Sequence, residues 1–262
     1  MSTPTSAPEA PAAKKAPTTV IFPPDQISPV YRRTRVLVRL AVSLIGKLDM
    51  VGTENIPATG PAILAPNHRA HVDPPYMSLV SGRQIYYMAK EELFTTNDKF
   101  GRFLYKLGAW PVRRGEADRA ALRMAVNLLK QGHVVCIFPE GTRSFDDSLL
   151  VAEKGFALIA KQTGAPIIPI ALEGTHRIWP KGTKRIHRGK VAITIGKPVT
   201  AQEILDAHGG GGKEALEVIG RDVMQRIADL FRFSRPTIAV ETSSPPAATS
   251  KQTLSSSTAA ED

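Results

Sequence analysis

The amino-acid sequence predicts an α/β protein with a mixed, largely parallel central sheet flanked by helices and preceded by an N-terminal amphipathic helix. Three observations lead to this class. Short apolar runs without clean alternation recur along the chain, which is typical of strands buried on both faces. Segments with helical spacing of apolar residues stand between these runs, and such alternation favours a parallel sheet. A longer amphipathic segment comes before the first run.

Five apolar runs are the predicted strands. In chain order they are PAILAPN (61–67), RQIYYMA (83–89), HVVCIFP (133–139), APIIPIAL (165–172) and KVAITIG (190–196). The predicted helices between them are DPPYMSLV (73–80), KFGRFLYKLG (99–108), EADRAALRMAVNLLKQG (116–132) and EKGFALIAKQTG (153–164). Active sites in such folds gather where strands end and helices begin, so the residues after each strand are the candidates for chemistry.

Residues 29–48 are the predicted amphipathic helix. Its polar stripe consists of Arg32, Arg35, Arg39, Ser43 and Lys47, and its apolar face of Val36, Leu37, Leu40, Ala41, Leu44, Ile45 and Leu48. One interpretation is a helix packed on the domain with its arginines in water. The other is a helix in the membrane interface with its arginines at lipid phosphates, and the two are compatible.

Composition divides the rest of the chain. Residues 1–28 are rich in Pro, Ala, Ser and Thr and are predicted as a disordered tail, as are residues 236–262. Residues 49–235 are predicted as one folded domain. The longest apolar candidate for a membrane span, VLVRLAVSLIG, has eleven residues, and no signal peptide is recognised. We therefore expect a soluble or peripheral protein.

Charge and cysteine content narrow the partners. The 262 residues include 34 Lys and Arg against 24 Asp and Glu, and the net charge of +10 favours anionic partners. Aromatic residues make up only 6% and the basic residues are scattered, which disfavours nucleic acid. The single cysteine, Cys136, lies in an apolar run, so no disulfide framework is possible and a reducing compartment fits.

The stretch NHRAHVD (67–73) places two histidines and an aspartate at the end of a predicted strand. Asp73 can be explained as the N-cap of the following helix. It can also orient His68, because a carboxylate on one ring nitrogen leaves the other nitrogen to take a proton from a hydroxyl. A third interpretation is a metal site made by His68, His71 and Asp73.

The stretch FPEGTRS (138–144) follows another predicted strand. Gly141 permits a tight turn, and the Thr142 hydroxyl and the Arg143 guanidinium supply hydrogen-bond donors. Such a turn is a good phosphate receptor, although a surface turn with a solvated arginine fits equally well.

Two further cationic positions stand near predicted strand ends. GAWPVRRG (108–115) is interpreted as a Gly-Pro turn that leads to Arg113 and Arg114, and Lys90 follows the second strand. Together with Arg143, these cations beside a His–Asp pair suggest a site for an alcohol that bears a phosphate.

These blocks, in this order, resemble the glycerolipid acyltransferase family, which includes the 1-acyl-sn-glycerol-3-phosphate acyltransferases. NHRAHVD is similar to the first block of the family (the HX4D motif), GAWPVRR to the second, FPEGTRS to the third and APIIPIAL to the fourth. The resemblance extends over residues 50–200. It departs at Ala70, where the family often has Ser.

The resemblance implies an acyltransferase catalytic domain. It makes His68 the general base and Asp73 its partner. The acceptor phosphate would be bound by Arg114, Glu140, Gly141, Thr142 and Arg143, with Lys90 as a helper. No metal is implied. The reaction would move a fatty-acyl group from acyl-CoA or acyl carrier protein to a lysophospholipid, most simply 1-acyl-sn-glycerol-3-phosphate, at the cytoplasmic face of the cell membrane and with no other cofactor.

Two other functions remain open at this point. A metal-dependent hydrolase would use His68, His71 and Asp73 as metal ligands and would lose activity with chelators. A non-catalytic membrane-surface binding protein would use only the amphipathic helix and would tolerate loss of His68.

Overall fold

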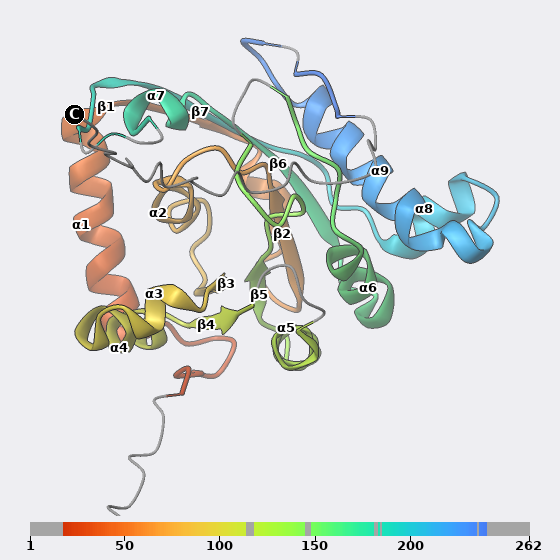
Figure 1. The fold of residues 1–262 in the computed structure, drawn as a ribbon, viewed down its shortest axis with the longest axis horizontal. Coiled ribbons are helices and arrows are strands. Elements are labelled where there is room, and N and C mark those ends of the chain that lie inside the picture. The colour runs from red at the N-terminus through yellow and green to blue at the C-terminus, as the bar shows by residue number, and fades with distance from the viewer. Residues whose placement is uncertain are drawn as a thin grey trace, which may run out of the picture.

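The structure, a computed structural model, describes residues 18–113, 118–144, 148–180, 183, 185–234 and 236–239 (Figure 1). A seven-stranded sheet with the strand order β1-β7-β6-β2-β5-β3-β4 forms its centre. The strands are β1 (Gly46–Val51), β2 (Ala62–Pro66), β3 (Ile85–Lys90), β4 (Ala109–Val112), β5 (Val134–Cys136), β6 (Ile167–Glu173) and β7 (Gly189–Ile195). Only β6 and β7 pair antiparallel, so the predicted mixed, largely parallel sheet is confirmed.

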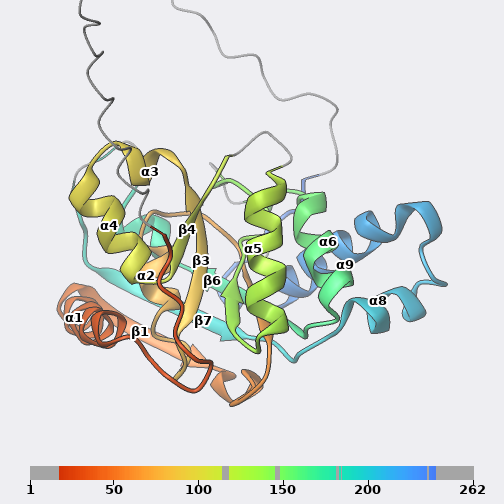
Figure 2. The ribbon, with the colours of Figure 1, turned by 90° about the horizontal axis from the view of Figure 1, so that it is seen from below.

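Helices cover both faces of the sheet. They are α1 (Pro29–Ile45), α2 (Asp73–Met77), α3 (Glu92–Thr95), α4 (Asp98–Lys106), α5 (Arg119–Lys130), α6 (Lys154–Thr163), α7 (Thr175–Ile178), α8 (Ala201–Ala207) and α9 (Ala215–Asp229). Short 3-10 turns occur at Thr53–Asn55 and Gly212–Glu214. Helices α1 and α2 lie on one side, and α5, α6 and α9 on the other (Figure 2).

Alternate residues of β2 explain this two-sided covering. Ile63 and Ala65 belong to the core cluster with α5, α6 and α9, whereas Ala62 and Leu64 belong to the cluster with α1 and α2. A strand that is apolar on both faces has no alternation of apolar and polar residues. Its sequence is therefore a continuous apolar run. All four side chains are fully buried.

The N-terminal helix is shorter than predicted, because residues 46–48 belong to β1. Gly46 leaves the helix and pairs at once with Gly189 of β7 in parallel register. A Cβ on Gly46 would lie 1.8 Å from the carbonyl oxygen of Gly189, so only glycine permits this approach of the two strands. Within the described part of the chain, no helix is long and apolar enough to cross a membrane.

The predicted turn in GAWPVRRG is also wrong, since Ala109–Val112 forms β4 alongside β3. β4 is the last strand at one edge of the sheet. An edge strand tolerates Pro111, because one side of the strand needs no N–H donor.

Parts of both predicted disordered tails are ordered against the domain. Residues 18–28 pack on the sheet: the Thr19 hydroxyl donates to the Ala109 carbonyl (2.9 Å) and the Ser28 amide to the Gln84 side chain (2.8 Å). Residues 236–239 run beside Leu149, whose amide donates to the Thr237 carbonyl at 2.8 Å. These hydrogen bonds satisfy backbone groups of the domain, namely the Ala109 carbonyl and the Leu149 amide. Residues 1–17 and 240–262 lie outside the described residues.

Candidate active site

The site is built where β2 ends. Asn67 is fully buried, and its side-chain amide donates to the Leu172 carbonyl (3.1 Å) while its oxygen accepts from the Leu172 amide (2.7 Å). This two-way pairing holds the end of β2 against β6. The turn that follows therefore starts from a fixed point.

His68 and Asp73 form a close pair on this turn. The distance between His68 Nδ1 and Asp73 Oδ2 is 2.7 Å, and both side chains are buried. An ionised carboxylate can only accept, so the pair keeps the proton on Nδ1. Nε2 is then the nitrogen that can take a proton from a substrate.

Asp73 is held by the turn itself. Its Oδ2 also accepts the backbone amides of Arg69 and Ala70, both at 2.7 Å. Asp73 is the first residue of α2, whose N-cap is Val72, and it makes no capping bond to that helix. The helix-capping interpretation of Asp73 is therefore wrong, and the carboxylate orients the imidazole and the turn that bears it.

Glu140 lies beneath the pair rather than at a phosphate site. It is 2% exposed; its Oε1 accepts the backbone amide of His68 (2.7 Å) and its Oε2 that of Leu150 (2.9 Å). The Ser144 amide in turn donates to the His68 carbonyl (3.0 Å). The predicted role of Glu140 in phosphate binding is thus corrected: it positions the backbone of His68.

Burial raises the pKa of the Glu140 carboxyl from 4.5 to about 7; the two amide bonds oppose the shift and the nearby Asp73 adds to it. Between these pH values the folded protein holds a proton that the unfolded chain has lost. The stabilisation that protonated Glu140 contributes is therefore complete below about pH 4.5. It is lost as the pH rises to about 7, by roughly 3 kcal/mol.

The Glu140→Gln variant should lack this pH dependence. We expect the free energy of unfolding of the wild type, relative to the variant, to fall by roughly 3 kcal/mol between pH 5 and pH 8, as measured by urea unfolding. Glu173→Gln is the matched control, because Glu173 is also buried and also accepts two backbone amides. A difference between wild type and Glu140→Gln that is constant with pH would contradict the assignment.

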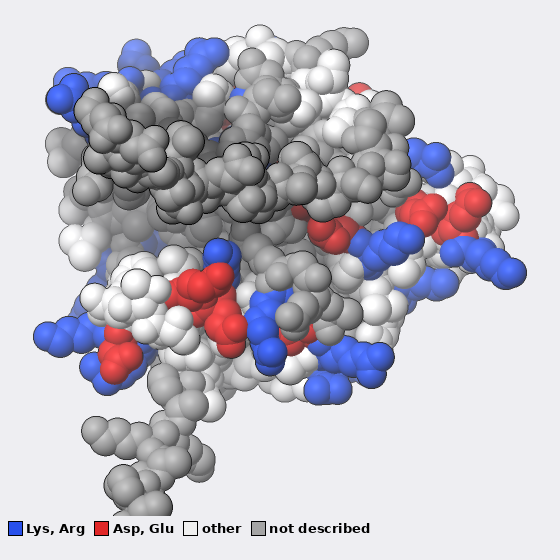
Figure 3. Space-filling model, in the orientation of Figure 1, with Lys and Arg blue, Asp and Glu red and all other residues white. Residues whose placement is uncertain are grey.

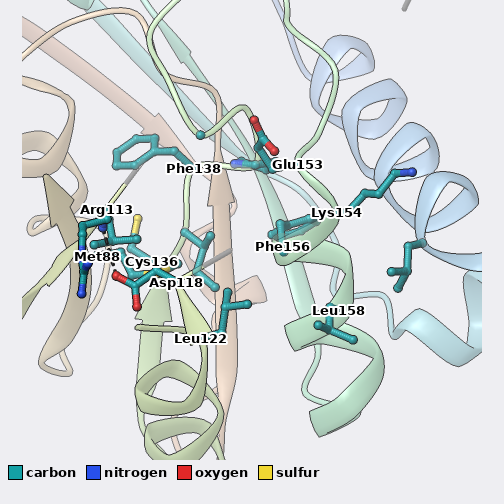
Figure 4. Close-up of a pocket in the computed structure, with 16 residues that line it drawn as sticks. Met88, Arg113, Asp118, Leu122, Cys136, Phe138, Glu153, Lys154, Phe156 and Leu158 are labelled. Carbon is teal, nitrogen blue, oxygen red and sulfur yellow. Dashed lines mark hydrogen bonds between the residues drawn. The ribbon is translucent and has the colours of Figure 1, made fainter. Parts of the chain in front are cut away.

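Phe138 connects the pair to a cavity. Its ring stacks on the His68 imidazole, with centroids 4.0 Å apart and planes at 25°. It also lines a cavity of about 540 Å³ between α5 and α6, close to the Gly141 turn (Figure 4). The walls are mostly apolar and include Met88, Leu122, Ile137, Phe156 and Leu158. Lys154 at the rim points away from the cavity and pairs with Glu217 (2.8 Å).

The predicted phosphate-binding residues are only partly brought together. Thr142 is exposed and Arg143 half-buried, directly before the Ser144 that contacts His68. Gly141 has φ of 62°, the left-handed conformation that favours glycine. Lys90 is exposed at the end of β3 and pairs with Glu92 (2.8 Å). Arg114 lies outside the described residues.

The three side chains proposed as metal ligands do not converge. His71 is exposed, and its ring faces Trp179 with centroids 5.9 Å apart, whereas His68 faces Asp73. Among the residues that the structure describes, no three His, Cys, Asp or Glu side chains are grouped to hold a metal ion. The geometry therefore favours an oriented base over a metal site.

Comparison with known proteins identifies the class. The Acyltransferase family model matches residues 47–173. The chain is 33% identical to the 1-acyl-sn-glycerol-3-phosphate acyltransferase of Bacillus subtilis (strain 168), over 77% of this chain and 96% of that protein. It is also 33% identical to the protein of the same name from Streptococcus pneumoniae, over 69% of this chain and 66% of that one.

A solved structure agrees with this result. The crystal structure of the 1-acyl-sn-glycerophosphate acyltransferase PlsC from Thermotoga maritima matches with a TM-score of 0.62 and 26% identity, over 76% of this chain and 79% of that one. The fold and the sequence matches make this protein an acyltransferase. Within that class, the chain belongs to the glycerolipid acyltransferase family, as the sequence blocks predict.

Proposed function

We propose that this protein transfers a fatty-acyl group from an acyl thioester, either acyl-CoA or acyl carrier protein, to the hydroxyl of 1-acyl-sn-glycerol-3-phosphate, giving phosphatidate. The observation that carries the proposal is the buried His68–Asp73 pair, 2.7 Å apart. The names of the relatives support this acceptor. No cofactor other than the thioester co-substrate is required.

In the proposed reaction, Nε2 of His68 takes the proton of the acceptor hydroxyl as its oxygen attacks the thioester carbonyl. A C–O bond forms and a tetrahedral intermediate carries the negative charge. The C–S bond then breaks, and the leaving thiolate takes the proton from the imidazolium. Asp73 stabilises that imidazolium and keeps the ring oriented, and no covalent acyl-enzyme forms.

The acceptor phosphate would be held by the Gly141–Thr142–Arg143 turn, with Arg114 and Lys90 as further cations. Arg143 stands one residue before Ser144, whose amide contacts the backbone of His68. A phosphate held on this turn lies close to the dyad. Fixing it there makes an ordinary alcohol reactive by proximity.

An acyl chain would lie in the cavity between α5 and α6. The cavity measures about 540 Å³ and its walls are largely apolar, as a fatty chain requires. Phe138 lines the cavity and contacts His68. The thioester end of such a chain would lie at Phe138, the residue that lines the cavity and stacks on the base.

A peripheral position on the cytoplasmic face of the cell membrane completes the proposal. Four large apolar side chains of α1 are exposed to solvent, namely Val36, Leu37, Leu40 and Leu44, with Leu44 73% exposed. Leu93 of α3 and Phe100 and Phe103 of α4 are exposed near the start of α1. An amphipathic helix with basic residues beside such a face is suited to the lipid interface.

Replacing Leu40 and Leu44 together by aspartate should weaken binding to phospholipid vesicles by at least about tenfold, because two side chains that enter the lipid are lost. Vesicle co-sedimentation of the full chain measures this. Val151→Asp, which changes an exposed apolar residue away from α1, should leave binding unchanged. Equal binding by wild type and the α1 variant would contradict the membrane position.

The reaction is tested by incubating the wild type with lysophosphatidate and, in separate assays, acyl-CoA or acyl carrier protein, each with and without EDTA. Phosphatidate that forms irrespective of EDTA supports the proposal and identifies the donor. Loss of product with EDTA would contradict the metal-free mechanism and favour a metal site at His68, His71 and Asp73. No product with either donor would overturn the assigned acceptor.

A further inference from the structure

The connection between β6 and β7, residues 174–188, concentrates positive charge. From residue 174 to residue 202 the chain has no Asp or Glu, yet it has seven of the 34 Lys and Arg residues. Since the net charge of the whole protein is +10, this stretch accounts for most of it. Three arginines of the connection are exposed in the described residues: Arg177, Arg185 and Arg188.

Hydrogen bonds and burial hold the described residues of this connection in place. Ile178 is fully buried, and the amide of His187 donates to its carbonyl at 2.8 Å. The indole N–H of Trp179 donates to the Thr183 carbonyl at 2.8 Å. In the described part of the chain, none of the three arginines forms a salt bridge with a carboxylate. Their charge is therefore available to an external anion.

The connection adjoins both the catalytic turn and α1. Its Trp179 ring faces His71, which belongs to the same turn as His68 and Asp73. Its end, Gly189, pairs with Gly46, where α1 passes into β1. In the view of Figure 1, α7 and the end of α1 both lie at the upper left, where Figure 3 shows Lys and Arg side chains. The charge thus continues the surface proposed to meet the membrane.

An exposed apolar residue lies within the charged segment. Ile186 is 53% exposed and directly follows Arg185. A single free phosphate is too small to contact arginines spread over this segment, and it gives the Ile186 side chain no apolar partner. A bilayer surface offers many phosphates in one plane and an apolar layer beneath them.

We propose that the connection between β6 and β7 binds the headgroups of anionic phospholipids and so docks the bilayer beside the His68–Asp73 pair. This inference rests on the membrane position proposed for α1. The two elements have different partners: α1 enters the apolar layer of any bilayer, whereas the connection requires anionic lipid.

The test compares the full-length wild type with the variant Arg177→Gln/Arg185→Gln/Arg188→Gln. Binding is measured by co-sedimentation with vesicles of phosphatidylcholine alone and of phosphatidylcholine mixed with phosphatidylglycerol. The variant should bind the anionic vesicles on the order of 100-fold more weakly than the wild type and the neutral vesicles equally well. Added salt should reduce the difference.

A matched control removes the same charge elsewhere. Arg119, Arg123 and Arg221 are exposed on α5 and α9, and their replacement by Gln should leave vesicle binding at the wild-type level. Equal binding of anionic vesicles by wild type and the connection variant would overturn the proposal, as would an equal loss in the control. Binding is measured without substrate, so the result is independent of whether the proposed reaction occurs.

Activity separates lipid from other anionic partners. The connection variant should lose activity on lysophosphatidate in anionic vesicles and keep it on a short-chain acceptor in detergent. Loss in detergent as well would mean that the arginines belong to the substrate site, which overturns the proposal. Unchanged vesicle binding with loss only when acyl carrier protein is the donor would overturn it in favour of an acidic protein partner.

Discussion

Replacing His68 by alanine is expected to lower kcat for acyl transfer to lysophosphatidate by between about a hundredfold and ten thousandfold. The acceptor hydroxyl keeps its proton in the variant, because among the described residues no other imidazole contacts Asp73. Product formation from acyl-CoA, followed over time with a fixed acceptor concentration, measures the loss. The variant should keep its fold, because Asp73 still accepts the backbone amides of Arg69 and Ala70 that hold the turn.

The matched control for this variant is His208→Ala, which removes an imidazole at the end of α8, remote from the dyad. It should retain wild-type activity. Equal rates for wild type and His68→Ala would exclude the general-base role and leave the His68–Asp73 pair with a structural role only. Near-identical thermal unfolding of both variants and the wild type is the check on folding.

The variant Asp73→Asn should lower kcat by a similar factor, up to about ten thousandfold, while acceptor KM changes little. The amide N–H₂ of asparagine donates to Nδ1, which forces the proton onto Nε2 and removes the base. In the wild type, Oδ2 of Asp73 accepts the amides of Arg69 and Ala70. The N–H₂ group of asparagine at this place would face these two donors and could not accept from them. A parallel fall in kcat and kcat/KM measures the loss of the oriented base.

Asp222→Asn is the control, because Asp222 also faces an imidazole, that of His208 at 3.8 Å, far from the site. It should leave kcat unchanged. A wild-type rate for Asp73→Asn would mean that the carboxylate only shapes the turn.

The dyad is predictable from the sequence because its members are close in the chain. Five positions separate His68 from Asp73, and the apolar run before them predicts the strand that presents them. The phosphate-binding role predicted for Glu140 is wrong for the opposite reason. Its contact with the His68 amide joins residues 72 positions apart, and no local pattern reports such a bond.

The missed strands have local causes. In β1, Lys47 has the helical spacing of the polar stripe of α1, so the sequence predicts that the helix continues. The close contact of Gly46 with Gly189 makes this segment a strand instead. In β4, Pro111 favours a turn until its position at the edge of the sheet is known. Helices α8 and α9 lie after the last predicted strand and were not predicted. The errors at β1 and β4 arise because tertiary pairing overrides local preference.

The close pairing of Gly46 with Gly189 has a mechanical consequence. No linker stands between the last turn of α1 and the sheet, because the residue after Ile45 is already a strand residue. The helix is therefore joined directly to the sheet and is not connected to it by a flexible linker. In the strand order β1-β7-β6-β2, three spacings separate β1 from the strand that carries His68, roughly 14 Å across the sheet. A bilayer that binds α1 would thereby also hold the sheet that presents the imidazole.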